Sequence, residues 1–384
     1  MGEDQTICRL GRTTMLKSRK LQFFIFGLII LALFALFIHL RQAVKTDIAA
    51  RLYQQWNQHY IHWGKDEAYV ITKQTPEGRI VLSEAQGYAM YIAVLAAERG
   101  EDTQEDFQKL YQYYMNHRTD QTQLMSWRQT VKNGQVQEDP NNATDGDLYI
   151  AYALIQAAQL WKDQASEYEE QARVILQDIL AYNYNSQANF LTAGNWASQE
   201  SDYYWLMRSS DTLPQLFETF YDFTKDEQWL SIKASMLEKL EMISAQEDTG
   251  LIPDFIWIDE GGEARVAEAN AVASAHDGDY YYNACRLPYV LAQSQDKQSQ
   301  QPLNKMMDIF MEQKSIYAGY SLDGKALDKH QPASFGAPIF YAASKNGSYN
   351  KLLQQNKYIF LQDLPSDSYY EAVIVTMIAL EILK

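Results

Sequence analysis

The stretch that decides the fold covers residues 143–161 and reads ATDGDLYIAYALIQAAQLW. Its apolar positions recur every three or four residues, at Leu148, Ala151, Leu154, Ala158 and Trp161. This spacing predicts a helix over residues 147–162, with Asp145 and Asp147 at its start. Acidic side chains in a first turn complement the positive end of the helix macrodipole. A purely structural role is therefore one interpretation of both carboxylates.

A second carboxylate, Glu84, also precedes a run with helical apolar spacing, SEAQGYAMYIAVLAA at residues 83–97. Ser83 and Gln86 fit a capping box, in which Glu84 would be a structural first-turn acid. That interpretation leaves Gly87 unexplained, because glycine is a poor helix former. A glycine here would allow another chain segment, or a sugar, to approach the backbone closely.

Taken together, the two segments resemble glycoside hydrolase family 8. Residues 143–161 match the family signature, Ala-Ser/Thr-Asp-Ala/Gly-Asp followed by a small and aliphatic stretch that closes on Phe/Trp. Residues 83–90 are similar to its general-acid segment, S-E-G-Q-G-Y-G-M, with alanine at two glycine positions. Residues 281–288, YYNACRLP, resemble its Y-D-A-x-R-x-P segment. The resemblance spans roughly residues 50–384.

The rest of the chain favours one all-α catalytic domain over residues 45–384. No Gly/Ser-rich or Pro-rich linker follows residue 45, and about a dozen amphipathic stretches can be marked. Examples are 47–60, 84–98, 104–116, 147–162, 166–181, 226–243 and 368–383. The resemblance implies that these helices form an (α/α)6 barrel, with an inner and an outer ring.

The N-terminal region predicts a membrane anchor. Residues 21–40, LQFFIFGLIILALFALFIHL, carry no charged side chain and are long enough to cross a bilayer. The charged residues before them are mostly basic, five against two acidic ones, which predicts a cytoplasmic segment at 1–20 and an extracellular catalytic domain. The apolar run is longer than a cleaved signal peptide usually has, so we favour an uncleaved, single-pass anchor in the cell membrane. Cleavage after Ala49 or Ala50, which would release a secreted domain, stays open.

Charge and motif content exclude several classes of partner. The chain carries 33 basic and 49 acidic residues, and the part after the apolar run carries 28 and 47, a net charge of −19. Nucleic acid is not expected as a partner, because phosphate binding needs a basic surface. The acidic surface fits a neutral polysaccharide, or a cationic one such as chitosan. The sequence has no metal-ligand, Walker, Rossmann or G-x-S-x-G pattern, so we expect no metal and no cofactor.

The resemblance implies an inverting glycosidase and assigns roles to its carboxylates. Glu84 would be the general acid, which requires a raised pKa. Asp145 would contact the sugar at the cleavage point and help to distort its ring, while Asp147 would support the helix start. Asn283 stands where many members carry an aspartate as the base. An amide cannot usefully accept a proton, so Asn283 could only position water or sugar.

Some family members with asparagine at that position take their base from an inserted loop. Residues 259–268, DEGGEARVAE, look like such a loop, and Asp277 and Asp279 follow soon after. Glu268 is our preferred candidate for the base. If no carboxylate reaches the water, the protein would be a weak hydrolase or none at all.

Aromatic content suits sugar binding, since the chain has eight tryptophans and 27 tyrosines whose flat faces can stack on pyranose rings. The resemblance implies substrate contacts for Trp127, for Tyr204 in the stretch SDYYWLM, and for Tyr282 and Arg286. Most aromatic residues of a chain lie in its core, and a core position is the alternative for Tyr204.

We therefore expect a membrane-anchored endo-glycosidase that hydrolyses β-1,4-linked glucan, either cellulose-like or mixed-linkage. The anchor would suit trimming of a polysaccharide exported by the cell's own synthase, a role that the family has in bacterial cellulose production. Chitosanase, licheninase and xylanase activity are alternatives within the family. An alternative of another class is a catalytically silent glycan-binding subunit of a synthase. Retention of Glu84 and Asp145 argues against this subunit, and Asn283 argues for it.

Overall fold

The structure, a computed structural model, describes residues 4–383, with side chains from residue 22 onward. One compact unit is formed by residues 50–382, and the chain up to residue 49 belongs to a second unit. The basic side chains of the predicted cytoplasmic segment 1–20 lie outside the described residues.

The N-terminal unit consists of most of the helix α1 (Asp4–Tyr60). The part that begins at Gln22 is long and apolar enough to cross a membrane, with a mean hydropathy of 2.8 and none of that window buried. Large apolar side chains are accordingly exposed along it, including Phe23 and Leu31. The predicted span 21–40 is therefore helical where it is described.

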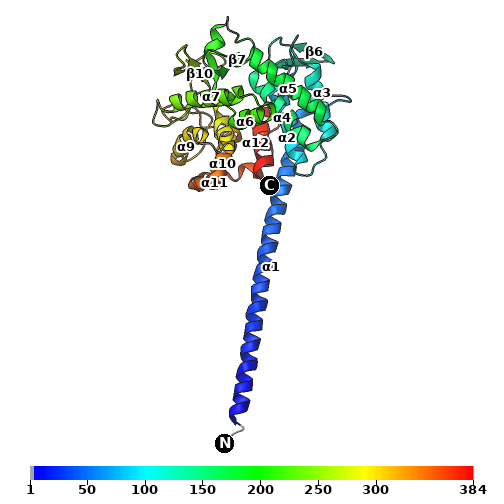
Figure 1. Ribbon diagram of the computed structural model, residues 1–384, viewed down its shortest axis with the longest axis vertical. Coiled ribbons are helices and arrows are strands. Elements are labelled where there is room, and N and C mark those ends of the chain that lie inside the picture. Colours follow the sequence, from blue (N-terminus) through cyan, green and yellow to red (C-terminus); the bar gives the residue numbers. More distant parts are fainter. Residues whose placement is uncertain (1–3, 384) are drawn as a thin grey trace. The chain divides into compact units, whose positions relative to one another are not determined.

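Within residues 50–382 an inner ring of helices closes on itself, because each helix contacts the next and the last contacts the first (Figure 1). The ring consists of α2 (Ser83–Ala97), α4 (Thr144–Leu160), α6 (Pro214–Thr224), α8 (Leu287–Gln293), α10 (Ala333–Lys345) and α12 (Tyr369–Ile382). Most faces of α2, α4 and α12 are buried, which suits their alanine-rich and aliphatic sequences.

An outer ring surrounds these helices, and each outer helix packs on the inner helix that precedes it in the chain. The outer helices are α3 (Gln104–Asn116), α5 (Ala165–Tyr182), α7 (Gln228–Ser244), α9 (Lys297–Glu312) and α11 (Asn350–Asn356). Residues 50–60 of α1 complete the ring beside α12, where the Trp56 ring lies 6.1 Å from that of Tyr369. The predicted (α/α)6 barrel is thus confirmed, and so are the predicted helices, to within a few residues at their ends, except that the predicted helix 47–60 is the C-terminal part of the longer helix α1.

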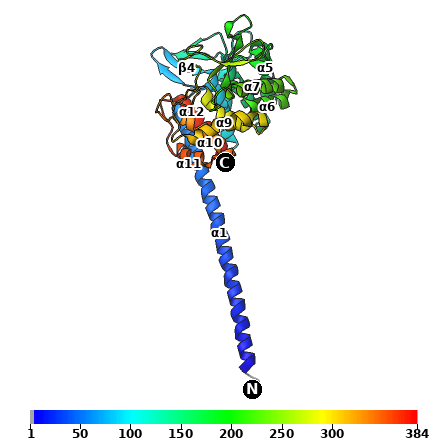
Figure 2. The same cartoon turned by 90° about the vertical axis from the view of Figure 1, so that its left-hand side faces the viewer.

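The strands gather at one end of the barrel in both views (Figures 1 and 2). A four-stranded sheet has the order β3 (Lys73–Thr75), β4 (Gly78–Leu82), β5 (Arg128–Lys132) and β6 (Gln135–Glu138). A three-stranded sheet has the order β11 (Ala264–Val266), β10 (Phe255–Ile258) and β9 (Leu206–Arg208). Two short pairs are β1 (Ile61–Trp63) with β2 (Ala68–Val70), and β7 (Tyr184–Asn185) with β8 (Phe190–Leu191).

The capping box suggested for α2 does not form. The N-cap of α2 is Leu82, and no side chain caps the helix. The buried Gln86 instead donates to the carbonyl oxygens of Ala68 at 3.0 Å and Leu110 at 2.8 Å. Gln86 thereby joins α2 to β2 and to α3, because a buried amide must find partners wherever the tertiary structure provides them.

Candidate active site

Three inner helices begin at one cavity, which has a volume of about 780 Å³. The second residue of each helix lines it: Glu84 of α2, Asp145 of α4 and Tyr370 of α12. The positive ends of these helix dipoles favour negative charge in this region. The structure therefore brings together the two carboxylates that the sequence analysis singled out.

Two glycines account for the closeness of α2 and α4. A Cβ atom on Gly87 would lie 2.8 Å from the carbonyl oxygen of Gly146, and one on Gly146 would lie 2.7 Å from the carbonyl carbon of Ser83. Any larger side chain would push the helices apart. The expectation that Gly87 admits another chain segment is confirmed, and that segment is the start of α4.

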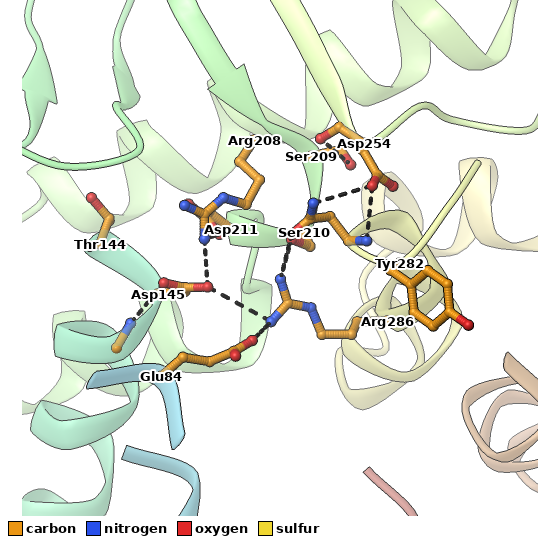
Figure 3. Close-up of polar contacts among 12 residues, drawn as sticks. Glu84, Thr144, Asp145, Arg208, Ser209, Ser210, Asp211, Asp254, Tyr282 and Arg286 are labelled. Carbon is orange, nitrogen blue, oxygen red and sulfur yellow. Dashed lines mark hydrogen bonds and ion pairs between the residues drawn. The ribbon is translucent and has the colours of Figure 1, made fainter. Parts of the chain in front are cut away.

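Arg286 connects the two carboxylates (Figure 3). It ends the 3-10 helix η3 (Ala284–Arg286), and its side chain is only 4% exposed. Nη1 donates to Oε1 of Glu84 and lies 3.7 Å from Oδ2 of Asp145, while Nη2 donates to Oγ of Ser210 at 2.7 Å. A buried guanidinium in this place fixes both acidic side chains.

Asp145 is held by a second arginine. Nη1 of Arg208, at the end of β9, donates to Oδ2 of Asp145 at 2.5 Å, and the Gly146 amide donates to Oδ1 at 3.0 Å. Behind Arg208 lies the buried Asp211, whose Oδ1 is 3.6 Å from Arg208 Nη1. Neither carboxylate oxygen of Asp211 has a hydrogen-bond partner among the described residues.

These surroundings move the pKa values of Glu84 and Asp145 apart. Burial raises the pKa of Glu84 above its ordinary value, although Arg286 opposes the shift. Burial also acts to raise the pKa of Asp145, but the charges of Arg208 and Arg286 outweigh it and the net shift is downward. A carboxyl group with a raised pKa beside one with a lowered pKa is the arrangement that acid-assisted cleavage of a glycosidic bond requires.

Asp147 has a supporting role, as predicted. Its Oδ1 accepts from the Met125 amide at 2.8 Å, and its Oδ2 accepts from Nδ2 of Asn142 at 2.7 Å. Burial raises the pKa of Asp147 to about 8. This side chain does not line the cavity; it ties the start of α4 to the two loops beside it.

The predicted substrate residues fall into two groups. Trp127, Tyr282 and Asn283 line the cavity, and Arg286 lies behind them against Glu84. Tyr204 does not line it, which corrects the expected substrate contact. Its side chain is buried beside β7, where the hydroxyl accepts from the Ser186 amide at 3.3 Å. The core position that the sequence left open for Tyr204 is the one observed.

The sequence analysis missed several residues that line the cavity, among them Trp196 and Arg208, whereas Tyr203 lies in the stretch SDYYWLM that it singled out. Tyr203 and Trp196 pack against each other, with ring centroids 5.1 Å apart. Tyr203 and Tyr204 are neighbours in the 3-10 helix η1 (Asp202–Trp205), so only the local turn decides which ring faces the cavity. Arg208 follows no sequence pattern that would separate it from a surface arginine.

The amide of Asn283 has a fixed orientation. Its Nδ2 donates to Oδ2 of Asp254 at 3.1 Å, and its Oδ1 accepts from Nη2 of Arg286 at 3.3 Å. Asp254 also accepts from the amides of Tyr281, Asn283 and Ala284, while burial raises its pKa to about 6. The oxygen of Asn283 is therefore the atom free to accept from a further donor, such as a water in the cavity.

The segment 259–268 is not an irregular loop: it contains the turn and the second strand, β11, of a β-hairpin whose first strand is β10. Glu268 lies outside the cavity lining, where it accepts from Nε1 of Trp257 at 2.9 Å. Asp277 accepts from the amides of Val272 and Ala273, and Asp279 pairs with His276 at 2.8 Å. Among the described residues, Glu84 and Asp145 are the carboxylates that line the cavity.

Known proteins resemble this chain over most of its length. The beta-glucanase of Niallia circulans is 27% identical over 346 residues, which is 87% of this chain and 83% of that protein. The endoglucanase of Bacillus sp. (strain KSM-330) is 26% identical over 330 residues, 80% of this chain and 70% of that protein.

Solved structures share the same architecture. The beta-1,3-1,4-glucanase from Paenibacillus sp. X4 superimposes with a TM-score of 0.81 at 26% identity, covering 89% of this chain and 92% of that one. Rex8A from Paenibacillus barcinonensis, at 20% identity and a TM-score of 0.68, shares the fold. Residues 27–382 match glycosyl hydrolases family 8, and the chain therefore belongs to that family and is a glycoside hydrolase.

Proposed function

We propose that this protein is an inverting endo-glycosidase that hydrolyses β-1,4-linked glucan, cellulose-like or mixed-linkage. The observation that carries the proposal is the pairing of Glu84, with a raised pKa, and Asp145, with a lowered one, on one buried arginine at an aromatic cavity. The names of the relatives, a beta-glucanase and an endoglucanase, support a β-glucan as substrate.

In this mechanism Glu84 protonates the oxygen of the glycosidic bond as that bond to the anomeric carbon breaks. Asp145 stays ionised and stabilises the positive charge that develops on the sugar ring, while it holds the ring through its hydroxyl groups. Trp127 and Trp196 both line the cavity, and the faces of their rings stack on the sugar units of the substrate.

The attacking water would be held by the oxygen of Asn283, because the nitrogen of that amide is already bonded to Asp254. The water must lose a proton as its oxygen bonds to the anomeric carbon. With no third carboxylate among the described residues that line the cavity, this proton passes to other water molecules. We therefore expect slow turnover, since a positioned base contributes about 10²–10⁴-fold to the rate.

The test is release of reducing ends by the full-length protein in detergent micelles, beside Glu84→Gln. Carboxymethylcellulose, mixed-linkage glucan, chitosan and xylan serve as substrates. We expect cleavage of one or both β-glucans and its loss in Glu84→Gln, which keeps the shape of the side chain but not its acidity. Cleavage of chitosan or xylan alone would contradict the substrate and favour the corresponding alternative within the family.

We further propose that α1 anchors the protein in the cell membrane with the catalytic domain outside, where it trims a polysaccharide exported by a synthase. The exposed apolar part of α1 and the basic residues before it support this orientation. Protease treatment of intact cells should remove the catalytic domain and leave a membrane-bound fragment. Release of a soluble domain that begins after Ala49 or Ala50 would instead indicate cleavage, and unchanged polymer output on gene deletion would contradict the link to synthesis.

One observation favours a second candidate function. The lack of a third carboxylate among the described lining residues is also what a glycan-binding subunit of a synthase would show. Such a subunit would bind one of the four polymers without cleaving it. Tight binding that Glu84→Gln leaves unchanged, together with no reducing-end release, would establish this candidate in place of the hydrolase.

A further inference from the structure

A second cavity, of about 620 Å³, lies at the other end of the β4–β5 strand pair and shares no lining residue with the catalytic cavity. Leu82 lines the catalytic cavity and pairs with Arg128, whereas Arg79 lines the second cavity and pairs with Val131. Three residues of strand separate the two positions, which is about 10 Å. Figure 2 shows β4 at the edge of the domain where this cavity lies.

Arg79 is held through Nη1, while its Nη2 and Nε have no hydrogen-bond partner among the described residues. Its Nη1 lies 3.1 Å from Nδ1 of His62 and donates to the hydroxyl of Tyr69, also at 3.1 Å. Burial and the charge of Arg79 lower the pKa of His62, which favours the neutral ring. Because Nδ1 accepts from Arg79, the ring proton is on Nε2, which becomes a further donor in the cavity.

Tyr113, from α3, lines the same cavity with a hydroxyl that has no hydrogen-bond partner among the described residues. The residue is only 1% exposed, and its ring stacks at 5.0 Å on that of Tyr69. A buried phenol normally finds a partner, because an unsatisfied hydroxyl costs free energy. This hydroxyl is therefore left for a partner from outside the described residues, and the cavity that Tyr113 lines is where such a partner would enter.

The charged side chains of this cavity are mainly basic. Lys132 donates to the carbonyl oxygen of Pro76 at 2.9 Å, and neither Lys132 nor Arg79 has a carboxylate within 4.0 Å among the described residues. Glu67 is the acidic residue of the lining, and its Oε2 is occupied by Nδ2 of Asn116 at 2.8 Å. The described lining thus carries two basic side chains against one acidic one, and the unused N–H groups of Arg79 suit an anion.

We propose that this second cavity binds the carboxylate group of an acidic sugar unit, a uronic acid residue carried by a glycan. The free edge of the Arg79 guanidinium matches a planar carboxylate, and Tyr113 and His62 can donate to further oxygens of the sugar. The choice of a sugar as the carrier rests on the proposed function, since the cavity lies on the same sheet as the glycan site.

The experiment is calorimetric titration of the full-length protein in detergent micelles with sodium glucuronate, glucose and glucose 6-phosphate. We expect saturable binding of glucuronate, at least ~10-fold weaker in Arg79→Gln, because a charge-assisted pair is lost. Tyr113→Phe should weaken glucuronate binding while the melting temperature stays level or rises, since that hydroxyl has no partner in the protein. Lys73→Gln, an equal charge change on β3 at a residue outside the lining, should leave binding unchanged.

Several outcomes would overturn the proposal. Glucose that binds as tightly as glucuronate would make the cavity a neutral-sugar site, and binding of glucose 6-phosphate alone would assign it to phosphorylated ligands. If Arg79→Gln fails to fold, unchanged binding in Tyr113→Phe is sufficient to reject it. Glu84→Gln should bind glucuronate like the wild type, so failure of the hydrolase proposal and failure of this one remain distinguishable.

Discussion

The backbones of α2 and α4 are in contact at Gly87 and Gly146. A Cβ atom placed on Gly87 would lie only 2.8 Å from the carbonyl oxygen of Gly146. Glu84 lies one helical turn before Gly87, and Asp145 directly precedes Gly146. The contact therefore brings both carboxylates within reach of Arg286. The catalytic geometry depends on two residues that have no side chain.

Gly87→Ala should destabilise the protein by about 1–3 kcal/mol. The new methyl group would overlap with backbone atoms of α4 and with Cβ of Tyr149, and these atoms can move only if the two helices shift. Activity should fall more steeply than stability, since α2 and α4 move apart. Urea unfolding and reducing-end release measure the two effects. Gly347→Ala is the matched control: a Cβ there meets nothing within 4 Å, and its stability should stay unchanged. Equal stability of the two variants would show that the helices can separate without cost.

Asp211→Asn should remove part of the pH dependence of stability. Burial raises the pKa of Asp211 from an ordinary 3.8 to about 7, so the folded protein retains a proton that the unfolded chain releases in this range. The free energy of unfolding therefore falls as the pH rises from 3.8 to about 7. In Asp211→Asn the free energy of unfolding should fall less over this pH range, so the variant should gain stability relative to the wild type at pH 8. Thermal unfolding of both proteins across the range measures the difference. Identical pH profiles would mean that Asp211 is ionised throughout.

Asn283→Asp should raise kcat, by about 10-fold or more, because it supplies a carboxylate where the water is expected. The new carboxylate would lie next to Asp254, now 3.1 Å from the amide nitrogen, and the like charges would raise its pKa towards neutrality. Steady-state kinetics on the preferred glucan measure the change. Asn283→Ala, which removes the amide without adding a base, should lower kcat. A folded Asn283→Asp variant no faster than the wild type would indicate that a base already reaches the water.

Trp127→Ala and Trp196→Ala should each raise KM, by about tenfold, with a smaller change in kcat. Each removes one aromatic face from the cavity wall, and such contacts contribute about 0.5–1.5 kcal/mol beyond burial. Trp63→Ala is the control, because Trp63 is 37% exposed and does not line the cavity. A KM that rises equally in the control would contradict stacking by the two cavity tryptophans.

Local sequence was enough to predict the helices that form the barrel and the two carboxylates at their starts. The apolar residues in 143–161 and 83–97 recur at helical spacing, and this pattern depends only on neighbours along the chain, although both helices are buried on most of their faces. Gly87 was informative for the same reason, since a glycine in a helix needs a packing explanation. The short strands escaped prediction, because two to five residues are too few to show an alternating pattern.

The sequence by itself thus determined the helices, the membrane-length apolar segment and the places of Glu84 and Asp145 at two helix starts, while its resemblance to glycoside hydrolase family 8 implied the barrel. Only the tertiary structure decided that Arg208 and Arg286 hold these carboxylates, that Tyr203 rather than Tyr204 faces the cavity, and that Glu268 lies outside it. Arg286 is separated from Glu84 by 202 residues along the chain. Contacts of that kind are set by how the inner helices close into a ring, and no local pattern of residues encodes them.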